Sequence, residues 1–165
     1  VCQRDCMHLP DESTVEKATV EDAEEILALQ KSAYVSEAEL IDDFTIPPLH
    51  QTIDEILSEF SHQVCLKFEL EKRIIGSVRC YLEKGTCHIG KLIVHPHYQK
   101  RGIGTKLLRA AESQFHNAER YELFTGEMSK RNLHIYEKNG YRVFYSKIIS
   151  QKLTLLFLEK INKKA

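Results

Sequence analysis

The sequence predicts a single domain of mixed α/β class over residues 13–160, after an irregular N-terminal segment at 1–12. A length of 165 residues suits one domain, and 42% hydrophobic residues suffice for a packed core. Hydrophobic residues follow a helical spacing near the start of the chain and again after Gly104. Between Val64 and Val94 the chain is instead rich in β-branched and aromatic residues, which is typical of strands. We therefore expect the element order β-α-α-β-β-β-α-β-α-β-β.

Capping residues mark the two helices expected in the first third of the chain. Thr19 with Asp22 forms a variant of the capping box, and Thr52 with Glu55 forms a second one. Two adjacent prolines exclude a regular element from the segment between these helices, at 37–50. The elements predicted here are a strand at 14–18, a helix at 20–35 and a short helix at 53–60.

Three strands separated by charged turns are expected next. The turns read EKR and EKG, which favours an antiparallel meander. An apolar stripe then predicts an amphipathic helix at 103–118. Ser129 is expected to cap a further helix at 130–139, which Gly140 would end. The strands are predicted at 64–70, 74–82, 87–94, 121–125, 142–149 and 153–159.

The segment VHPHYQKRGIG, residues 94–104, combines a strand end, a proline turn and two glycines that open a helix. A glycine costs a helix about 1 kcal/mol relative to alanine, so two in one first turn need another reason. Unpaired N–H groups at a helix N-terminus attract phosphate, and Gly102 and Gly104 would let a ligand reach the backbone. Because Lys100 and Arg101 add positive charge, the segment predicts an anion site.

Two other diphosphate-binding motifs do not fit this segment. A dinucleotide fingerprint needs a third glycine where Leu107 stands, and a P-loop needs Gly-Lys-Ser/Thr after four intervening residues. The chain instead resembles, over nearly its whole length, the GNAT superfamily of acyl-CoA-dependent N-acyltransferases. The central family motif, Gln/Arg-x-x-Gly-x-Gly/Ala after Leu-x-Val-x-Pro, is matched by Leu92, Val94, Pro96, Gln99, Gly102 and Gly104. The second motif, Asn-x-x-x-Tyr-x-x-x-Gly-Tyr/Phe, is matched by Asn132, Tyr136, Gly140 and Tyr141.

The resemblance implies a fold and a co-substrate. The fold would hold a mostly antiparallel sheet whose fourth and fifth strands separate, opened by a bulge near Ile93. Acetyl-CoA would place its diphosphate on the glycine segment and its pantetheine arm along the fourth strand. Asn132 would hydrogen-bond that arm, and Tyr136 would point at the sulfur. The residues implied to bind acetyl-CoA are Leu92, Ile93, Val94, Gln99, Lys100, Arg101, Gly102, Ile103, Gly104, Thr105, Asn132 and Tyr136.

The resemblance further implies direct transfer of the acetyl group to an amine. The Val94 N–H would polarise the thioester carbonyl. Tyr136 would give a proton to the departing thiolate, because a phenol with a pKa near 10 matches the thiolate in basicity. Two residues remain open as the base: His88, because an unperturbed imidazole titrates near neutral pH, and Glu127, just after the fifth strand. The catalytic residues that we expect are Tyr136 and His88.

Charge is divided unevenly along the chain. Residues 1–62 hold 15 acidic and 3 basic side chains, whereas the remainder holds 9 and 20. This division indicates either two binding faces of opposite sign or ordinary solvated helix faces. The loop at 34–50 corresponds to the segment that often shapes the family's acceptor pocket, so we expect a cationic amine of a small molecule or a protein. Its acidic residues are Glu37, Glu39, Asp42 and Asp43.

Other partners are not expected. An odd number of cysteines, five, argues against a disulfide framework and favours a cytoplasmic protein. The apolar runs are too short to span a bilayer, no signal peptide is visible, and no basic stripe interleaved with aromatic residues indicates nucleic-acid binding. No metal is expected, since the two sets that suggest ligands are incomplete: Cys2, Cys6 and His8, and His95 and His97.

The leading hypothesis is therefore an acetyl-CoA-dependent N-acetyltransferase. The alternative is a catalytically idle acyl-CoA-binding module that regulates a partner. Replacing Tyr136 by Phe separates the two, because only an enzyme has turnover to lose. The stretch LTLLFL near the C-terminus is compatible with a homodimer, and equally with a strand buried in one subunit.

Overall fold

The computed structural model describes residues 14–163, so the segment predicted to be irregular at 1–12 lies outside the described residues, together with Cys2, Cys6 and His8. Seven strands form one sheet in the order β1-β2-β3-β4-β5-β7-β6. The pairs are antiparallel apart from β4 and β5, which run parallel. The predicted mixed α/β class with a mostly antiparallel sheet is confirmed.

The elements follow the predicted order along the chain. The strands are β1 (Val15–Lys17), β2 (Val64–Leu70), β3 (Arg73–Glu83), β4 (Thr86–Val94), β5 (Arg120–Gly126), β6 (Arg142–Ile148) and β7 (Thr154–Ile161). The α-helices are α1 (Ala23–Ile41), α2 (Ile53–Phe60), α3 (Ile103–Gln114) and α4 (Lys130–Lys138). Short 3₁₀ helices lie at η1 (Val20–Asp22), η2 (Pro47–Leu49) and η3 (Pro96–Tyr98).

Two helix ends differ from the prediction. α1 runs on to Ile41 instead of ending at Val35, and it stops where Asp42 takes a left-handed conformation with a φ of 53°. The added segment, SEAELI, is rich in good helix formers, and the prolines that follow affect only the chain beyond the helix. α3 ends at Gln114 instead of Ala118, because Phe115 leaves the helical conformation while it packs against the core.

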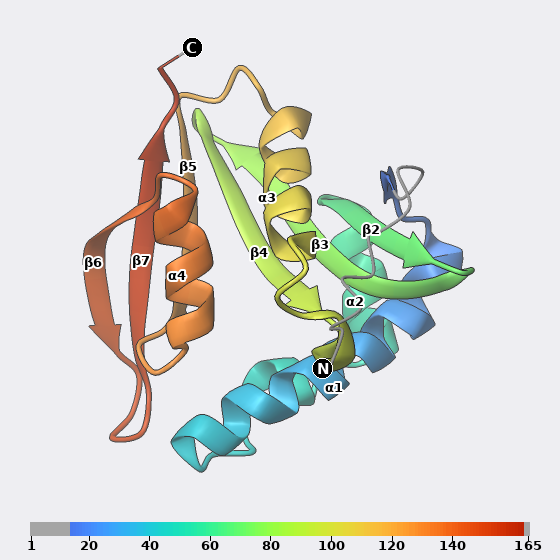
Figure 1. The fold of residues 1–165 in the computed structure, drawn as a ribbon, viewed down its shortest axis with the longest axis horizontal. Helices are drawn as coiled ribbons and strands as arrows, with labels where there is room; N and C mark the ends of the chain where they lie inside the picture. Colours follow the sequence, from blue (N-terminus) through green and yellow to red (C-terminus); the bar gives the residue numbers. More distant parts are fainter. Residues whose placement is uncertain (1–13, 164–165) are drawn as a thin grey trace, which may run out of the picture.

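The helices cover both faces of the sheet. α1 and α2 pack on one face, whereas α3 packs on the other and α4 lies in front of β5 and β7 (Figure 1). The stripe predicted for α3 is buried: Ile103, Leu107, Leu108 and Ala111 are at most 1% exposed. At about 25 cal/mol per Å² of apolar surface, this burial is the main force that fixes α3 on the sheet.

β4 and β5 separate along their length (Figure 1), as the resemblance implied. They pair only over Thr86–His88 and Arg120–Glu122. Beyond that point the register of β4 against β3 shifts between Ser77 and Arg79, and Lys91 takes a φ of 51°. This is a β-bulge close to the predicted place, and a bulge bends the strand that carries it. Within residues 14–163, the second half of β4 therefore has no partner strand on its β5 side.

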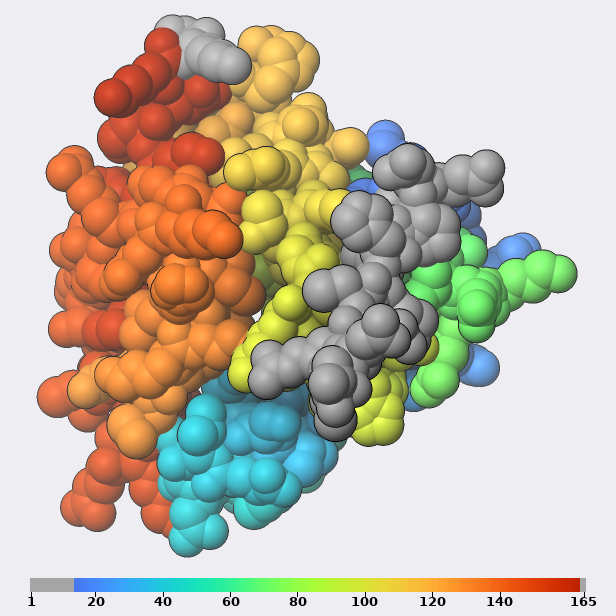
Figure 2. All heavy atoms as spheres, viewed as in Figure 1, coloured from blue at the N-terminus to red at the C-terminus, as the bar shows by residue number. Residues whose placement is uncertain are grey.

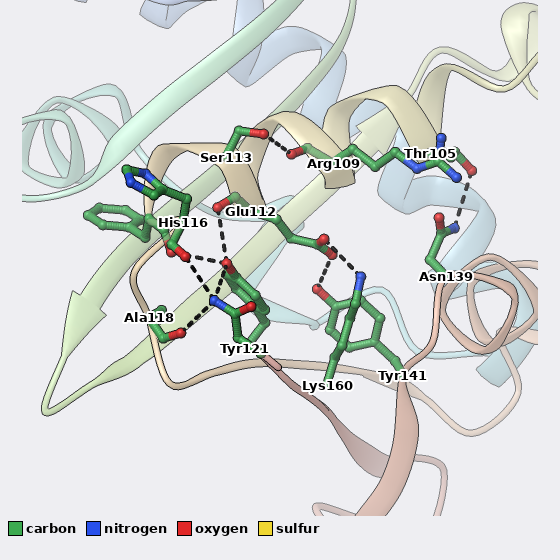
Figure 3. Close-up of polar contacts among 12 residues, drawn as sticks. Thr105, Arg109, Glu112, Ser113, His116, Ala118, Tyr121, Asn139, Tyr141 and Lys160 are labelled. Carbon is green, nitrogen blue, oxygen red and sulfur yellow. Dashed lines mark hydrogen bonds and ion pairs between the residues drawn. The ribbon is translucent and has the colours of Figure 1, made fainter. Parts of the chain in front are cut away.

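A polar cluster ties α3 to the other side of this separation (Figure 3). The Glu112 carboxylate accepts from Tyr141 Oη at 2.8 Å and from Lys160 Nζ at 2.9 Å. Near the start of α3, Asn139 Nδ2 donates to Thr105 Oγ1 at 3.3 Å. These bonds join α3 to the end of α4 and to β7, so they hold the two parts of the sheet at a fixed opening.

Candidate functional site

A cavity of about 440 Å³ lies between β4, α3, α4 and α1. Figure 2 shows the atoms of α4 and the second half of α1 meeting on this side of the molecule. Of the residues predicted to bind acetyl-CoA, Arg101 and Tyr136 are not in its wall. Those that do line it are Leu92, Ile93, Val94, Gln99, Lys100, Gly102, Ile103, Gly104, Thr105 and Asn132.

The start of α3 presents open backbone amides. The Lys106 N–H is the first to bond within the helix, to the Gly102 carbonyl at 3.1 Å. The N–H groups of residues 103–105 therefore have no backbone acceptor in the described part of the chain, as at any helix start. With the positive end of the helix dipole behind them, these groups favour an anion such as a phosphate.

The two glycines of this segment have different structural reasons. Gly102 has a φ of 82°, in the left-handed region, and no atom of the described residues lies within 4 Å of the position of a Cβ. Gly104 is helical, and a Cβ there would lie 3.4 Å from Ile135 Cδ1 and 4.0 Å from Val94 Cγ2. The first glycine allows the turn into the helix. The second keeps the space between α3, β4 and α4 open.

The backbone of Val94 faces the separation between β4 and β5. The His95 N–H donates to the Ile75 carbonyl at 2.7 Å, and in an antiparallel ladder the direction of these groups alternates from residue to residue. The N–H and carbonyl of Val94 therefore point away from β3, whereas those of Ile93 point toward it. The Val94 carbonyl accepts from Gln99 Nε2 at 3.2 Å.

Gln99 also links the glycine segment to α4. Its Oε1 accepts a hydrogen bond from Arg131 Nη1. Arg131 and Lys138 both line the cavity, and the prediction missed them. Their spacing of seven residues on one helix, with Ile135 between them, was a usable signal, because such residues share a helix face.

Tyr136 is buried behind the wall of the cavity, with 5% of its surface exposed. Burial raises the pKa of its phenol, and the charges of Tyr34 and Glu37 raise it further. The hydroxyl therefore stays protonated at neutral pH, and it is a weaker acid than the free phenol on which the prediction was based. It has no hydrogen-bond partner within residues 14–163. Asn132, one turn earlier on α4, donates to Thr125 Oγ1 at 3.4 Å.

The acidic residues expected near the acceptor do not act as one group. Glu37 lines the cavity together with Tyr34, and its Oε1 accepts from Ser129 Oγ at 3.0 Å. The other three are exposed or half-exposed: Asp43 accepts from Thr45, and Asp42 lies 3.9 Å from Lys152 Nζ. Tyr34 was not predicted, although its spacing from Glu37 places both on one face of α1.

The two candidate bases lie apart from the cavity. His88 sits where β4 and β5 still pair, with Nδ1 3.5 Å from Glu122 Oε2 and its ring stacked on Tyr81 at 4.9 Å. Glu127 is exposed, beyond the end of β5. Neither lines the cavity. The geometry therefore gives no support to either residue as the base.

Cys80 and Cys87, both fully buried, are free thiols on β3 and β4. His95 and His97 contact each other, with ring centroids 5.0 Å apart. In residues 14–163 no group of three or more His, Cys, Asp or Glu side chains could hold a metal ion. Over the same residues, no helix is both long and apolar enough to cross a membrane.

Known proteins resemble this chain in sequence and in fold. A family model described as an acetyltransferase (GNAT) domain matches residues 61–143. UPF0157 protein YqkA of Bacillus subtilis is 30% identical over 120 residues, which is 73% of this chain and 34% of YqkA. The chain thus spans about a third of the length of this curated relative.

Two solved structures share the fold at low sequence identity. The PaiA N-acetyltransferase from Thermoplasma acidophilum, in complex with coenzyme A, has a TM-score of 0.74 and 16% identity, with 89% of this chain and 97% of that chain covered. The ribosomal-protein-S18-alanine N-acetyltransferase from Escherichia coli has a TM-score of 0.75 and 11% identity, with 93% and 96% covered. With half of its length matched by the family model, the chain belongs to the GNAT acetyltransferase family.

Proposed function

We propose that this protein is an N-acetyltransferase that moves the acetyl group of acetyl-CoA directly to a primary amine. The observation that carries the proposal is that open helix amides and an unpaired strand edge lie along one cavity. The open helix amides suit a diphosphate, and the unpaired strand edge suits an extended arm that carries amide groups. That a solved structure of the same fold, the Thermoplasma enzyme, contains coenzyme A supports this assignment.

The residues at the cavity suit acetyl-CoA as co-substrate. The diphosphate would lie on the amides at the start of α3, where Lys100 and Arg101 supply charge, and Arg131 adds a third cation. The pantetheine arm would follow the backbone of Leu92 and Val94 and meet the Asn132 amide. Ile93 would only line the cavity, because its backbone N–H and carbonyl face β3 and are not available to the arm.

Acetyl transfer needs a polarised carbonyl and a proton for the leaving sulfur. The Val94 N–H points into the strand separation and would donate to the thioester oxygen, where negative charge develops. Tyr136 would protonate the thiolate as the C–S bond breaks, because its phenol is neutral well above pH 7. Acetyl-CoA supplies the activated acyl group, and the chain supplies position and a proton.

The acceptor would be a primary amine that carries positive charge, on a small molecule or a protein. The Escherichia coli relative acts, by its name, on an alanine of ribosomal protein S18, which supports an amine acceptor. Nucleic acid and membranes are not proposed as partners. We place the protein in the cytoplasm on the basis of its cysteine usage: the three described thiols are buried and unpaired.

A homodimer is also proposed, through the face of the sheet formed by β5, β7 and β6. Phe157 lies between Phe124 and Tyr145, with ring centroids 5.4 and 5.5 Å apart. Phe124 and Tyr145 are 51% and 54% exposed. An exposed aromatic cluster is typical of a protein contact. Sedimentation that finds only monomers over a range of concentrations would contradict the dimer.

The experiment that tests the function is a comparison of the wild-type chain with Tyr136→Phe. The wild type should bind acetyl-CoA in a calorimetric titration and release thiol when an acceptor amine is added. Tyr136→Phe should keep the affinity within about twofold and lose turnover by about 100-fold, within the range for general acid catalysis. If the wild type binds acetyl-CoA but acetylates no amine in a broad panel, the idle binding module is the correct function.

A further inference from the structure

The charged residues in the wall of the cavity are divided between two faces of the sheet. The cations Lys100, Arg131 and Lys138 come from the segment before α3 and from α4. The one carboxylate among the described lining residues is Glu37, on α1. α1 packs on the face of the sheet opposite to α3. The cations and the carboxylate therefore come from different elements around one cavity.

Glu37 is held in place but is not neutralised. Ser129, only 3% exposed, donates its hydroxyl proton to Glu37 Oε1 at 3.0 Å. The second oxygen, Oε2, has no hydrogen-bond partner in the described part of the chain, and no basic side chain there forms an ion pair with this carboxylate. Because Glu37 lines the cavity, this oxygen can accept from a donor on a molecule that binds there.

Tyr34 lines this corner of the cavity, and the Tyr136 phenol is buried behind the cavity wall. Tyr34 lies one turn before Glu37 on α1, and Tyr136 comes from α4. Tyr34 and Glu37 line the same cavity, and the bond from Ser129, which directly precedes α4, places the carboxylate beside the start of that helix. Burial raises the pKa of both phenols, and the charge of Glu37 raises it further. Neither hydroxyl has a hydrogen-bond partner within residues 14–163. An acceptor, a carboxylate and the proposed proton donor can therefore meet at one place.

We propose that Glu37 binds the primary ammonium group of the acceptor and takes its proton, with Tyr34 as a second contact. This inference rests on the proposed acetyl transfer and names a candidate base that lines the cavity, which His88 and Glu127 do not. The substrate class is a primary amine that is protonated in solution. Its ammonium donates to Glu37 Oε2, where no donor from residues 14–163 competes.

The protons and electrons balance in this reaction. The ammonium gives one proton to Glu37, which passes it to water. The nitrogen lone pair then forms a bond to the thioester carbon, and the C–S bond breaks with its electron pair on sulfur. Tyr136 gives its proton to that sulfur, and the second proton lost by the nitrogen restores the phenol. The products are the N-acetyl amine, coenzyme A with a free thiol, and one proton in solution.

The test compares Glu37→Gln with Glu39→Gln in the full chain. Glu39 is a matched control because it is exposed, two residues further along the same helix. The Glu37→Gln variant can still accept from Ser129, so the corner stays folded. The probes are butylamine, spermidine, glycine and a peptide with an N-terminal alanine. The readouts are thiol release, from which kcat and KM for the amine are taken, and the Kd for coenzyme A.

We expect Glu37→Gln to lower kcat/KM for the amine by at least about tenfold, which corresponds to one charge-assisted hydrogen bond of about 1.5 kcal/mol. The Kd for coenzyme A should stay within about twofold, and Glu39→Gln should match the wild type. Tyr34→Phe should raise KM more than it lowers kcat. If the two glutamine variants have equal kcat/KM for the amine, the inference about Glu37 is overturned while the proposed function stands. If the wild type acetylates none of the probes, the proposed function fails and the inference with it.

Discussion

The two glycines before and within α3 should respond in opposite ways to alanine. Gly102 has a φ of 82° and a ψ of 5°, a left-handed conformation that costs an L-residue about 1–2 kcal/mol. Alanine also restricts the unfolded chain, which returns about 0.5 kcal/mol. Gly102→Ala should therefore destabilise the protein by about 1 kcal/mol, although no atom of residues 14–163 lies within 4 Å of the added Cβ.

Gly104→Ala should instead stabilise the fold. The position is helical, and the new Cβ would make ordinary contacts with Ile135 at 3.4 Å and Val94 at 4.0 Å. Alanine is favoured over glycine in a helix by about 0.5–1 kcal/mol. The two alanine variants should thus differ by about 1.5–2 kcal/mol in the free energy of unfolding.

Thermal unfolding measures this difference directly. A change of 1 kcal/mol shifts the Tm of a domain of this size by about 2–4 °C. The Gly102→Ala variant should melt about 2–4 °C below the wild type, and the Gly104→Ala variant about 1–4 °C above it. A Gly102→Ala variant that is as stable as the wild type would refute the backbone argument. A Gly104→Ala variant that melts clearly lower would refute the claim of free space.

Three further predictions concern stability. Burial raises the pKa of Tyr34 to about 12, whereas an unfolded tyrosine titrates near 10. The contribution of Tyr34 to the free energy of unfolding is complete below about pH 10 and falls by about 1.4 kcal/mol per pH unit toward pH 12. In urea titrations between about pH 10 and 12, Tyr34→Phe should therefore lose less stability with rising pH than the wild type does. Glu112→Gln should cost about 2 kcal/mol by weakening the bonds to Tyr141 and Lys160, measured as a lower urea midpoint, and an unchanged midpoint would contradict the role of this cluster. Arg79→Leu should cost about 3 kcal/mol by calorimetric unfolding, because it removes the 3.3 Å ion pair to Glu59, and a neutral effect would show that this pair contributes nothing.

The order of elements followed from local signals in the sequence. Capping boxes, the apolar stripe of α3 and the β-branched runs each act within a few residues, so they could be found without tertiary information. The glycine segment was found in the same way. What the sequence could not supply was the separate role of each glycine, since φ at Gly102 and the neighbours of Gly104 depend on the packed chain.

The acceptor side of the site was harder to predict for a physical reason. Four acidic residues lay in a segment expected to be a loop, where no side-chain direction can be assigned. Because α1 continues through the segment to Ile41, Glu37 shares a face with Tyr34 while Glu39 points elsewhere. The prediction for His88 used only its position in the fourth strand. At that point β4 still pairs in parallel with β5, and this pairing keeps His88 away from the cavity.

One calorimetric comparison tests the central proposal, that the backbone amides at the start of α3 bind the diphosphate of coenzyme A. Coenzyme A and pantetheine, which lacks the diphosphate, are titrated into the same preparation. Coenzyme A should saturate a single site and bind at least about 100-fold more tightly, the equivalent of about 2.7 kcal/mol from charge-assisted hydrogen bonds. Equal affinities, or no saturable heat with coenzyme A, would contradict it.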